Sequence, residues 1–324
     1  MRAVLLKSFG DESVLKIGDV APPQLGPDDI RISIAATAVN RADLLQRQGH
    51  YPPPPGASEI LGLECAGHVV EVGSNVLGWR TGERAMALLP GGGYAEQAVV
   101  HAGSAMHVPD ALSDEEAAAI PEVYLTAFLN IFILGIGKRG ERLLIHGGGS
   151  GVGTAGTTLA KLAGLHVIVT AGSAAKCARC MRHGADEAID YHIDDFSERA
   201  RDIDIVLDHI GAAYLARDLR VLRTGGRVVI IGSMGGERNA EIDVGAVLGK
   251  RLQIIGSTLR TRSPEEKQRI VEAFTARFGE DLRAGRIRPV IDHVYSLEQV
   301  ADAHRHMNGD HFGKIVLRVS EDQK

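Results

Sequence analysis

Cysteine, aromatic residues and long apolar runs are all scarce in this sequence. Its 3 cysteines among 324 residues make no disulfide framework, so a reducing, cytoplasmic environment is expected. No stretch approaches the roughly 18 apolar residues that span a bilayer, and the opening MRAVLLKSFG is not followed by the apolar core of a signal peptide. We therefore expect a cytoplasmic protein with no membrane partner.

A block of positive charge is also missing. The net charge is −5, and lysine and arginine do not cluster. Nucleic-acid binding needs clustered cations to neutralise phosphates, so we expect no nucleic-acid partner. Glycine, in contrast, is abundant at 39 residues, and with only 4% aromatic residues this balance favours α/β layers joined by tight turns.

The chain is long enough for two domains, and its pattern changes twice along its length. Residues 1–122 contain short apolar or alternating runs broken by Gly, Pro and Asp, which are typical of strands. From 123 to 260 apolar strands alternate with helices, which predicts a parallel sheet covered on both faces. Residues 261–324 differ again. We predict an α/β protein with a cofactor domain (123–260) inserted between two pieces of a β-rich domain (1–122 and 261–324).

Individual elements can be placed from these patterns. Two helices are expected to begin with a capping box, at Ser113 with Glu116 and at Ser263 with Glu266. In the cofactor domain, helices are expected at 151–164 and 174–185, and strands at 142–148, 166–172, 203–211, 227–233 and 252–259.

The strongest single motif is LLIHGGGSGVGTAGTTLAKLAG, residues 143–164. A buried strand runs into a glycine-rich loop and then into a helix of small and apolar residues. Glycines let the backbone turn sharply and approach a pyrophosphate at the helix N-terminus. The spacing departs from G-x-G-x-x-G, because Ser150 stands at the middle glycine. The order strand, loop, helix still predicts a dinucleotide site.

The end of the second strand predicts which dinucleotide binds. Sites for NAD usually place Asp or Glu here, to hold the ribose hydroxyls. This sequence has Gly172 at that point, followed by Ser173 and, one helical turn later, Lys176. A hydroxyl and a cation suit the 2′-phosphate of NADP. We therefore predict NADPH as the cofactor.

The stretch GLECAGHVVEVG, residues 62–73, raises the question of a metal site, because it contains Glu64, Cys65 and His68. On a strand, Glu64 and His68 would lie roughly 13 Å apart, and Cys65 would face the other way. Zinc needs its ligands about 2 Å away. We expect no metal ion here.

Two other groups of polar residues are weaker candidates. Asp208 and His209 end an apolar strand and could be imagined as an acid–base pair. Adjacent strand residues face opposite ways, so we favour the interpretation that they line the cofactor edge. His304, His306 and His311 are interpreted as a solvated helix end.

Several segments together resemble a known family, the medium-chain dehydrogenase/reductase superfamily. In its zinc alcohol dehydrogenases the stretch at 62–64 typically reads G-H-E, with the histidine as a ligand, whereas here it is Gly-Leu-Glu. The chain is more similar to the zinc-less quinone oxidoreductases, above all to those with a QRQGxYxPPPGA loop. The segments that carry this resemblance are VNRADLLQRQGHYPPPPGASEILGLECAGHVVEVG, MALLPGGGYAE, AAAIPEVYLTAF, IHGGGSGVG, TAGSAAK, IDY and GKIVL.

The resemblance implies a GroES-like catalytic domain, a Rossmann domain with a doubly wound parallel sheet, a homodimer, and a set of site residues. Tyr51, on a proline-stiffened loop, and Ser150 are expected to be catalytic. The expected cofactor contacts are Asn40, Thr126, Gly149, Ser150, Gly151, Val152, Gly172, Ser173, Lys176, Tyr191, Ser233, Leu259, Arg260 and Lys314.

The chemistry follows from the replaced zinc ligand. Zinc polarises an oxygen atom during hydride transfer, so without it the acceptor must already be electron-poor. We therefore predict an NADPH-dependent quinone reductase. A 2-alkenal or enone double-bond reductase shares this scaffold and remains an alternative, as does a non-catalytic, crystallin-like NADPH-binding protein.

Overall fold

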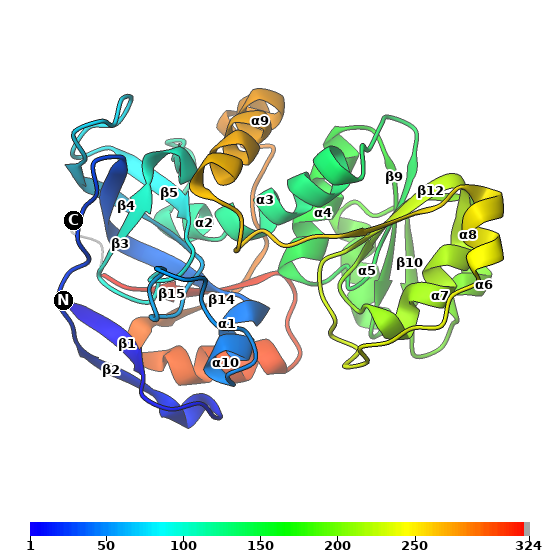
Figure 1. Cartoon of the computed structure of the whole chain (residues 1–324), viewed down its shortest axis with the longest axis horizontal. Helices are drawn as coiled ribbons and strands as arrows, with labels where there is room; N and C mark the ends of the chain where they lie inside the picture. Colours follow the sequence, from blue (N-terminus) through cyan, green and yellow to red (C-terminus); the bar gives the residue numbers. More distant parts are fainter. Residues whose placement is uncertain (321–324) are drawn as a thin grey trace. The chain divides into compact units, whose positions relative to one another are not determined.

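The computed structural model describes residues 1–320 and divides the chain into two compact units. The β-rich unit comprises Met1–Leu125 and the segment from Leu259 onward, and the parallel-sheet unit comprises Thr126–Thr258. The predicted boundaries, after residues 122 and 260, lie a few residues from these. Figure 1 shows both units coloured along the sequence.

The β-rich unit is built around a mostly antiparallel seven-stranded sheet in the order β14-β15-β3-β4-β5-β7, with β6 also paired to β3. A separate two-stranded sheet is formed by β1 and β2. The strands are β1 (Arg2–Leu6), β2 (Leu15–Asp19), β3 (Asp29–Val39), β4 (Glu64–Val72), β5 (Arg84–Leu88), β6 (Gln97–His101), β7 (Ala105–His107), β14 (Ile291–Ser296) and β15 (Lys314–Arg318).

Two helices of this unit begin where the sequence predicts. Ser113 caps α2 (Asp114–Ala118) and Ser263 caps α9 (Pro264–Arg283), each in a capping box, which confirms both predicted starts. The other helices of the unit are α1 (Arg41–Arg47), α10 (Val300–Asn308) and the first residues of α3 (Pro121–Phe128), a helix that continues past the unit boundary.

The parallel-sheet unit contains six strands in the order β10-β9-β8-β11-β12-β13, and every neighbouring pair is parallel. This order is that of a doubly wound sheet, which confirms the predicted fold class. The strands are β8 (Arg142–Ile145), β9 (His166–Ala171), β10 (Glu187–Asp190), β11 (Ile203–Asp208), β12 (Leu222–Ile230) and β13 (Gln253–Gly256). Strand β10 was not predicted, because it is short and only partly apolar.

Helices flank this parallel sheet and connect its strands (Figure 1). They are α4 (Gly151–Leu162), α5 (Ala174–His183), α6 (Phe196–Arg199), α7 (Ala212–Val221) and α8 (Val244–Lys250), with a π-helical segment at Leu129–Leu134. Both predicted helices, α4 and α5, begin at the expected residues. Within residues 1–320, no helix has both the length and the apolar character that crossing a bilayer demands.

Candidate functional site

The glycine-rich loop lies between β8 and α4, as predicted. At two of its positions the backbone conformation or a close contact requires glycine. Gly147 has φ +62°, which a side chain would strain, and a Cβ at Gly153 would collide with the Gly147 carbonyl oxygen. Ser150 caps α4, its Oγ accepting a hydrogen bond from the Gly153 N–H at 3.0 Å. A loop this close to the start of a twelve-residue helix fits a pyrophosphate.

The predicted ribose end forms at the carboxyl edge of β9. Ser173 caps α5 and accepts a hydrogen bond from the Lys176 N–H at 3.2 Å. A Cβ at Gly172 would meet the Tyr191 hydroxyl, so these two residues lie in contact. The structure therefore gathers Gly172, Ser173, Lys176 and Tyr191 at one place, with Tyr191 42% exposed and accessible to a ligand.

Of the other predicted cofactor residues of this unit, Thr126 and Ser233 lie outside those two groups, whereas Gly149, Gly151 and Val152 belong to the glycine-rich loop and the start of α4. Thr126 is in α3, where its carbonyl oxygen accepts a hydrogen bond from Asn130. Ser233 lies beyond β12 and donates its hydroxyl hydrogen to the carbonyl oxygen of Glu237. Gly151 and Val152 form the first turn of α4, and Gly149 precedes the capping serine.

In the β-rich unit, Glu64 is part of a buried ion pair. Its carboxylate Oε1 lies 2.8 Å from the Nζ of Lys314 and accepts a hydrogen bond from the Asn40 side chain at 2.9 Å. Glu64 is fully buried and Lys314 is 2% exposed. Cys65 is also buried, whereas His68 is exposed. Glu64, Cys65 and His68 are thus not arranged around a common point.

Asn40 is held rigidly by this ion pair. Lys314 donates to its Oδ1 at 2.6 Å, and its Nδ2 donates to Glu64 and to the Ala38 carbonyl oxygen. Lys314 also donates to the Val39 carbonyl oxygen at 3.0 Å. All three N–H donors of Lys314 therefore point at partners in this unit.

Asp43 supports the same place from α1, and sequence reasoning missed it. Its carboxylate accepts hydrogen bonds from the Asn40 N–H, the Gly62 N–H and the Tyr94 hydroxyl at 2.8, 3.0 and 3.1 Å. Burial nevertheless raises its pKa from 3.8 to about 6. Tyr94 in turn contacts His304.

His304 corrects one interpretation made from the sequence. It is fully buried rather than part of a solvated helix end. Its ring lies between Tyr94 and Arg47, with nitrogen contacts of 3.1 and 3.2 Å. Burial, together with the Arg47 charge, lowers the His304 pKa to about 3, so the ring is neutral. It connects Tyr94 and Arg47 through hydrogen bonds.

Tyr51 lies on the proline-rich loop and is fastened by Arg260. The guanidinium carbon of Arg260 is 5.3 Å from the centre of the Tyr51 ring. The same group donates to the Pro90 carbonyl oxygen at 2.9 Å and to the Gln46 side chain at 2.7 Å. Arg260 is only 3% exposed and its neighbour Leu259 6%. In the structure Arg260 thus anchors the loop that carries Tyr51.

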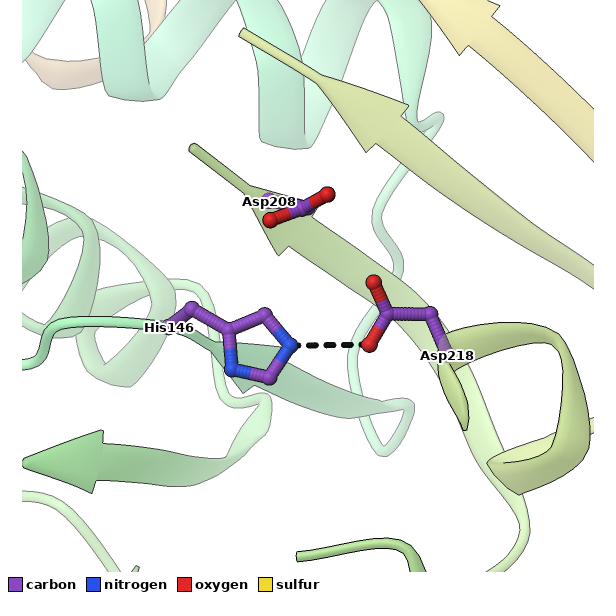
Figure 2. Close-up of side chains that lie close together, drawn as sticks. All are labelled: His146, Asp208 and Asp218. Atoms are coloured by element: carbon purple, nitrogen blue, oxygen red, sulfur yellow. Dashed lines mark hydrogen bonds and ion pairs between the residues drawn. The ribbon is translucent and has the colours of Figure 1, made fainter. Parts of the chain in front are cut away.

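A second buried polar cluster lies at the carboxyl edge of the parallel sheet: His146, Asp208 and Asp218 (Figure 2). His146 Nε2 is 2.8 Å from Asp218 Oδ1, and its Nδ1 is 3.1 Å from the Thr170 hydroxyl. Within residues 1–320 this group alone brings three possible ligand atoms within 4.8 Å of one another. Both ring nitrogens already have partners, which favours a hydrogen-bonded cluster over a metal site.

Asp208 forms hydrogen bonds with the backbone that follows β11. Its Oδ1 accepts hydrogen bonds from the N–H groups of Ile210 and Gly211. Burial and then the neighbouring Asp218 raise its pKa from 3.8 to about 6. Asp208 is fully buried and shapes the turn after β11. His146 stands in the glycine-rich motif, but nothing in the sequence indicates that it pairs with Asp218, 72 positions away.

Comparisons with known proteins find relatives that match this chain along nearly its whole length. Residues 26–110 match the family described as "Alcohol dehydrogenase GroES-like domain", and residues 183–317 match the family described as "Zinc-binding dehydrogenase". A quinone oxidoreductase from Lama guanicoe is 33% identical, covering 98% of this chain and 97% of that protein.

Solved structures give the same result. The Escherichia coli quinone oxidoreductase complexed with NADPH has a TM-score of 0.86 at 25% identity, covering 98% of this chain and 100% of that one. A protein described as an NAD-dependent alcohol dehydrogenase has a TM-score of 0.84 at 31% identity, covering 99% of this chain and 100% of that one.

Proposed function

This chain belongs to the quinone oxidoreductases of the medium-chain dehydrogenase/reductase superfamily, and we propose that it reduces quinones with NADPH and without a metal ion. As a member of that superfamily it is an oxidoreductase. The proposal concerns which cofactor it uses, which acceptor it reduces and which residues take part.

The preference for NADPH is carried by the group at the carboxyl edge of β9. Gly172 leaves room for the Tyr191 hydroxyl at the point where an NAD site usually has a carboxylate. Ser173 and Lys176 begin α5, and a hydroxyl and an ammonium group suit a 2′-phosphate. We propose that Ser150, Gly151 and Val152 hold the pyrophosphate.

Bound NADPH supplies a hydride, and the residues of the β-rich unit would orient the acceptor. The Asn40 side chain is fixed by Glu64 and Lys314, and a side chain held in this way suits a position beside the nicotinamide. Lys314 acts through Asn40, because its donors are already used. Tyr51, anchored by Arg260, forms a wall of the acceptor pocket.

We propose a quinone as the acceptor because of the residues that stand where zinc-containing relatives bind their metal ion. Leu63 stands where zinc-containing relatives of the superfamily have a histidine, and Glu64 is bound to Lys314. A simple ketone needs an electrophile to accept hydride, whereas a quinone is activated by its own conjugation. An enone is activated in the same way and defines the second candidate reaction.

A spectrophotometric screen of NADPH oxidation tests this proposal. Small and bulky quinones, enones and simple ketones would be compared at equal concentrations, with metal analysis of the purified protein. We expect turnover with quinones, little with ketones, and no stoichiometric zinc. A preference for enones of about a hundredfold, equivalent to roughly 2.7 kcal/mol in the barrier, would reassign the protein as a double-bond reductase. NADPH binding with no turnover would favour the crystallin-like alternative.

We further propose a homodimer formed through the edge of the parallel sheet. β13 is the edge strand, and apolar side chains are exposed on it and on the preceding helix α8: Val244 at 69%, Leu248 at 79% and Ile254 at 41%. Exposed edges and apolar patches mark association surfaces. Light scattering should find a dimer that Leu248→Lys weakens; a monomeric wild type would contradict this proposal.

A further inference from the structure

Among residues 1–320 the Glu122 carboxyl group has no ion-pair partner, whereas the neighbouring Glu64 is paired with Lys314. The Glu122 backbone N–H, in the first turn of α3, donates to Glu64 Oε2 at 2.8 Å. Lys314 neutralises Glu64 and uses its remaining donors on Asn40 and on the Val39 carbonyl oxygen. No ammonium hydrogen of Lys314 is left for the Glu122 side chain.

The surroundings of Glu122 favour its protonated form. Burial is the main cause that raises its pKa from 4.5 to about 8, and the negative charge of Glu64 comes next. Asp43 acts in the same direction, while Lys314 and Lys267 act against it. The start of a helix favours a carboxylate, so burial and the nearby negative charges outweigh that effect here.

Glu122 lies close to Asn40 and influences Tyr51. Its backbone N–H and the Asn40 side chain donate to the two oxygens of the same Glu64 carboxylate, at 2.8 and 2.9 Å. The Glu122 charge adds to burial in raising the Tyr51 pKa, and Arg260, 5.3 Å from the Tyr51 ring, lowers it. Glu122 is partly exposed. The protein atoms around its carboxyl group are nevertheless the main cause of its raised pKa. Among residues 1–320 no group donates a hydrogen bond to its side-chain oxygens, so they are open to a ligand or to water.

We propose that the Glu122 carboxyl group is the proton donor that completes reduction of the acceptor. The inference rests on the proposed function, because it concerns the acceptor bound against Tyr51. Once the acceptor has taken the hydride it is an anion; the O–H bond of Glu122 breaks and a new O–H bond forms on the acceptor. The resulting carboxylate then takes a proton from water. NADPH is oxidised, the acceptor is reduced by two electrons, and one solvent proton is consumed.

An acid works best when its pKa is close to the operating pH. Glu122, with a pKa of about 8, is protonated at neutral pH and still gives up its proton readily. The Tyr51 phenol, whose pKa is raised above its usual 10, is a weaker acid at the same place. Tyr51 therefore serves as the pocket wall and Glu122 as the acid.

Kinetics of Glu122→Gln test the role, because glutamine keeps the shape of the side chain and removes the acid. We expect kcat to fall about a hundredfold with KM for NADPH unchanged, and Glu122→Asp to recover part of that loss. The wild-type kcat should decline as the pH rises through about 8, and Glu122→Gln should lack this decline. Tyr51→Phe, the matched control, should keep it. An unchanged kcat in Glu122→Gln would overturn the assignment.

A second measurement needs no turnover. Infrared difference spectra between wild type and Glu122→Gln, recorded across pH 6 to about 9, report the C=O stretch of the protonated carboxyl group. We expect this band at pH 7 and its loss near pH 8. An ionised Glu122 at pH 7 in a protein that reduces quinones would refute only the proton-donor role. A wild type that reduces no acceptor would refute both that role and the proposed function.

Discussion

The two units of this protein hold their candidate functional residues by different means. In the parallel-sheet unit, Ser150 and Ser173 are placed by the backbone, each as the cap of a helix that follows a strand. In the β-rich unit, Asn40 is placed by the side chains of Glu64 and Lys314. A backbone-built site keeps its shape when one side chain is changed, whereas a site built from a buried ion pair depends on both partners.

The largest effect should come from breaking the ion pair in the β-rich unit. Lys314→Met leaves the Glu64 charge buried without a counter-ion, which should lower the free energy of unfolding by about 3–5 kcal/mol. Urea unfolding measures this change. The double variant Glu64→Gln/Lys314→Met removes both charges and should be clearly more stable than Lys314→Met alone. Equal stabilities of these two variants would show that Glu64 carries no uncompensated charge.

A change of intermediate size is expected in the buried cluster of the parallel-sheet unit. Folding raises the Asp208 pKa from 3.8 to about 6, so the folded protein binds this proton more tightly and loses stability as the pH rises between those values. Asp208→Asn removes that loss while keeping an oxygen for the N–H groups of Ile210 and Gly211. Its free energy of unfolding should exceed that of wild type by about 1–2 kcal/mol at pH 8.

The same variant provides its own control at low pH. Near pH 4 Asp208 is protonated in the folded protein, so Asp208→Asn and wild type should unfold at similar urea concentrations. Asp218→Asn should also flatten the pH dependence, because the Asp218 charge helps to raise the Asp208 pKa. A gain in stability for Asp208→Asn that is the same at pH 4 and pH 8 would argue against this account.

The smallest effect is expected from Lys176, a partly exposed side chain near the start of α5 in the parallel-sheet unit. Lys176→Ala should weaken NADPH binding about tenfold, or roughly 1.4 kcal/mol, through loss of one charge-assisted contact with the 2′-phosphate. NADH binding should not change, because NADH lacks the 2′-phosphate. Fluorescence titrations with both cofactors measure the ratio, and Arg182→Ala, in the last turn of the same helix, is the matched control. An unchanged ratio of affinities would remove Lys176 from the phosphate site.

The backbone-built site could be largely predicted, because its parts are consecutive in the chain. Strand β8, the glycine-rich loop and helix α4 occupy a single run of residues, and local patterns of apolar residues and glycine specify each part. The strand β10 was missed, since four residues of mixed polarity give too weak a pattern. The position of Tyr191 against Gly172 depends on that strand and required the tertiary structure.

The ion-paired site could not be derived in the same way. Asn40 and Glu64 are 24 positions apart and Lys314 lies 274 positions beyond Asn40, so nothing local predicts that they share hydrogen bonds. The family resemblance indicated Asn40 and Lys314 as cofactor contacts, but not that Lys314 is buried behind Asn40. His304 shows the same limit, because a histidine-rich helix end gives no sign of which ring faces the core.

The sequence by itself determined the alternation of strands and helices around the glycine-rich turn, apart from β10, because this alternation follows from local conformational preference and apolar periodicity. Only the tertiary structure decided which charges are paired and which carboxyl groups keep their protons. Those properties arise from burial and from neighbours distant in the chain. Within a single unit, Glu64 is paired with Lys314, whereas residues 1–320 provide no ion-pair partner for Glu122.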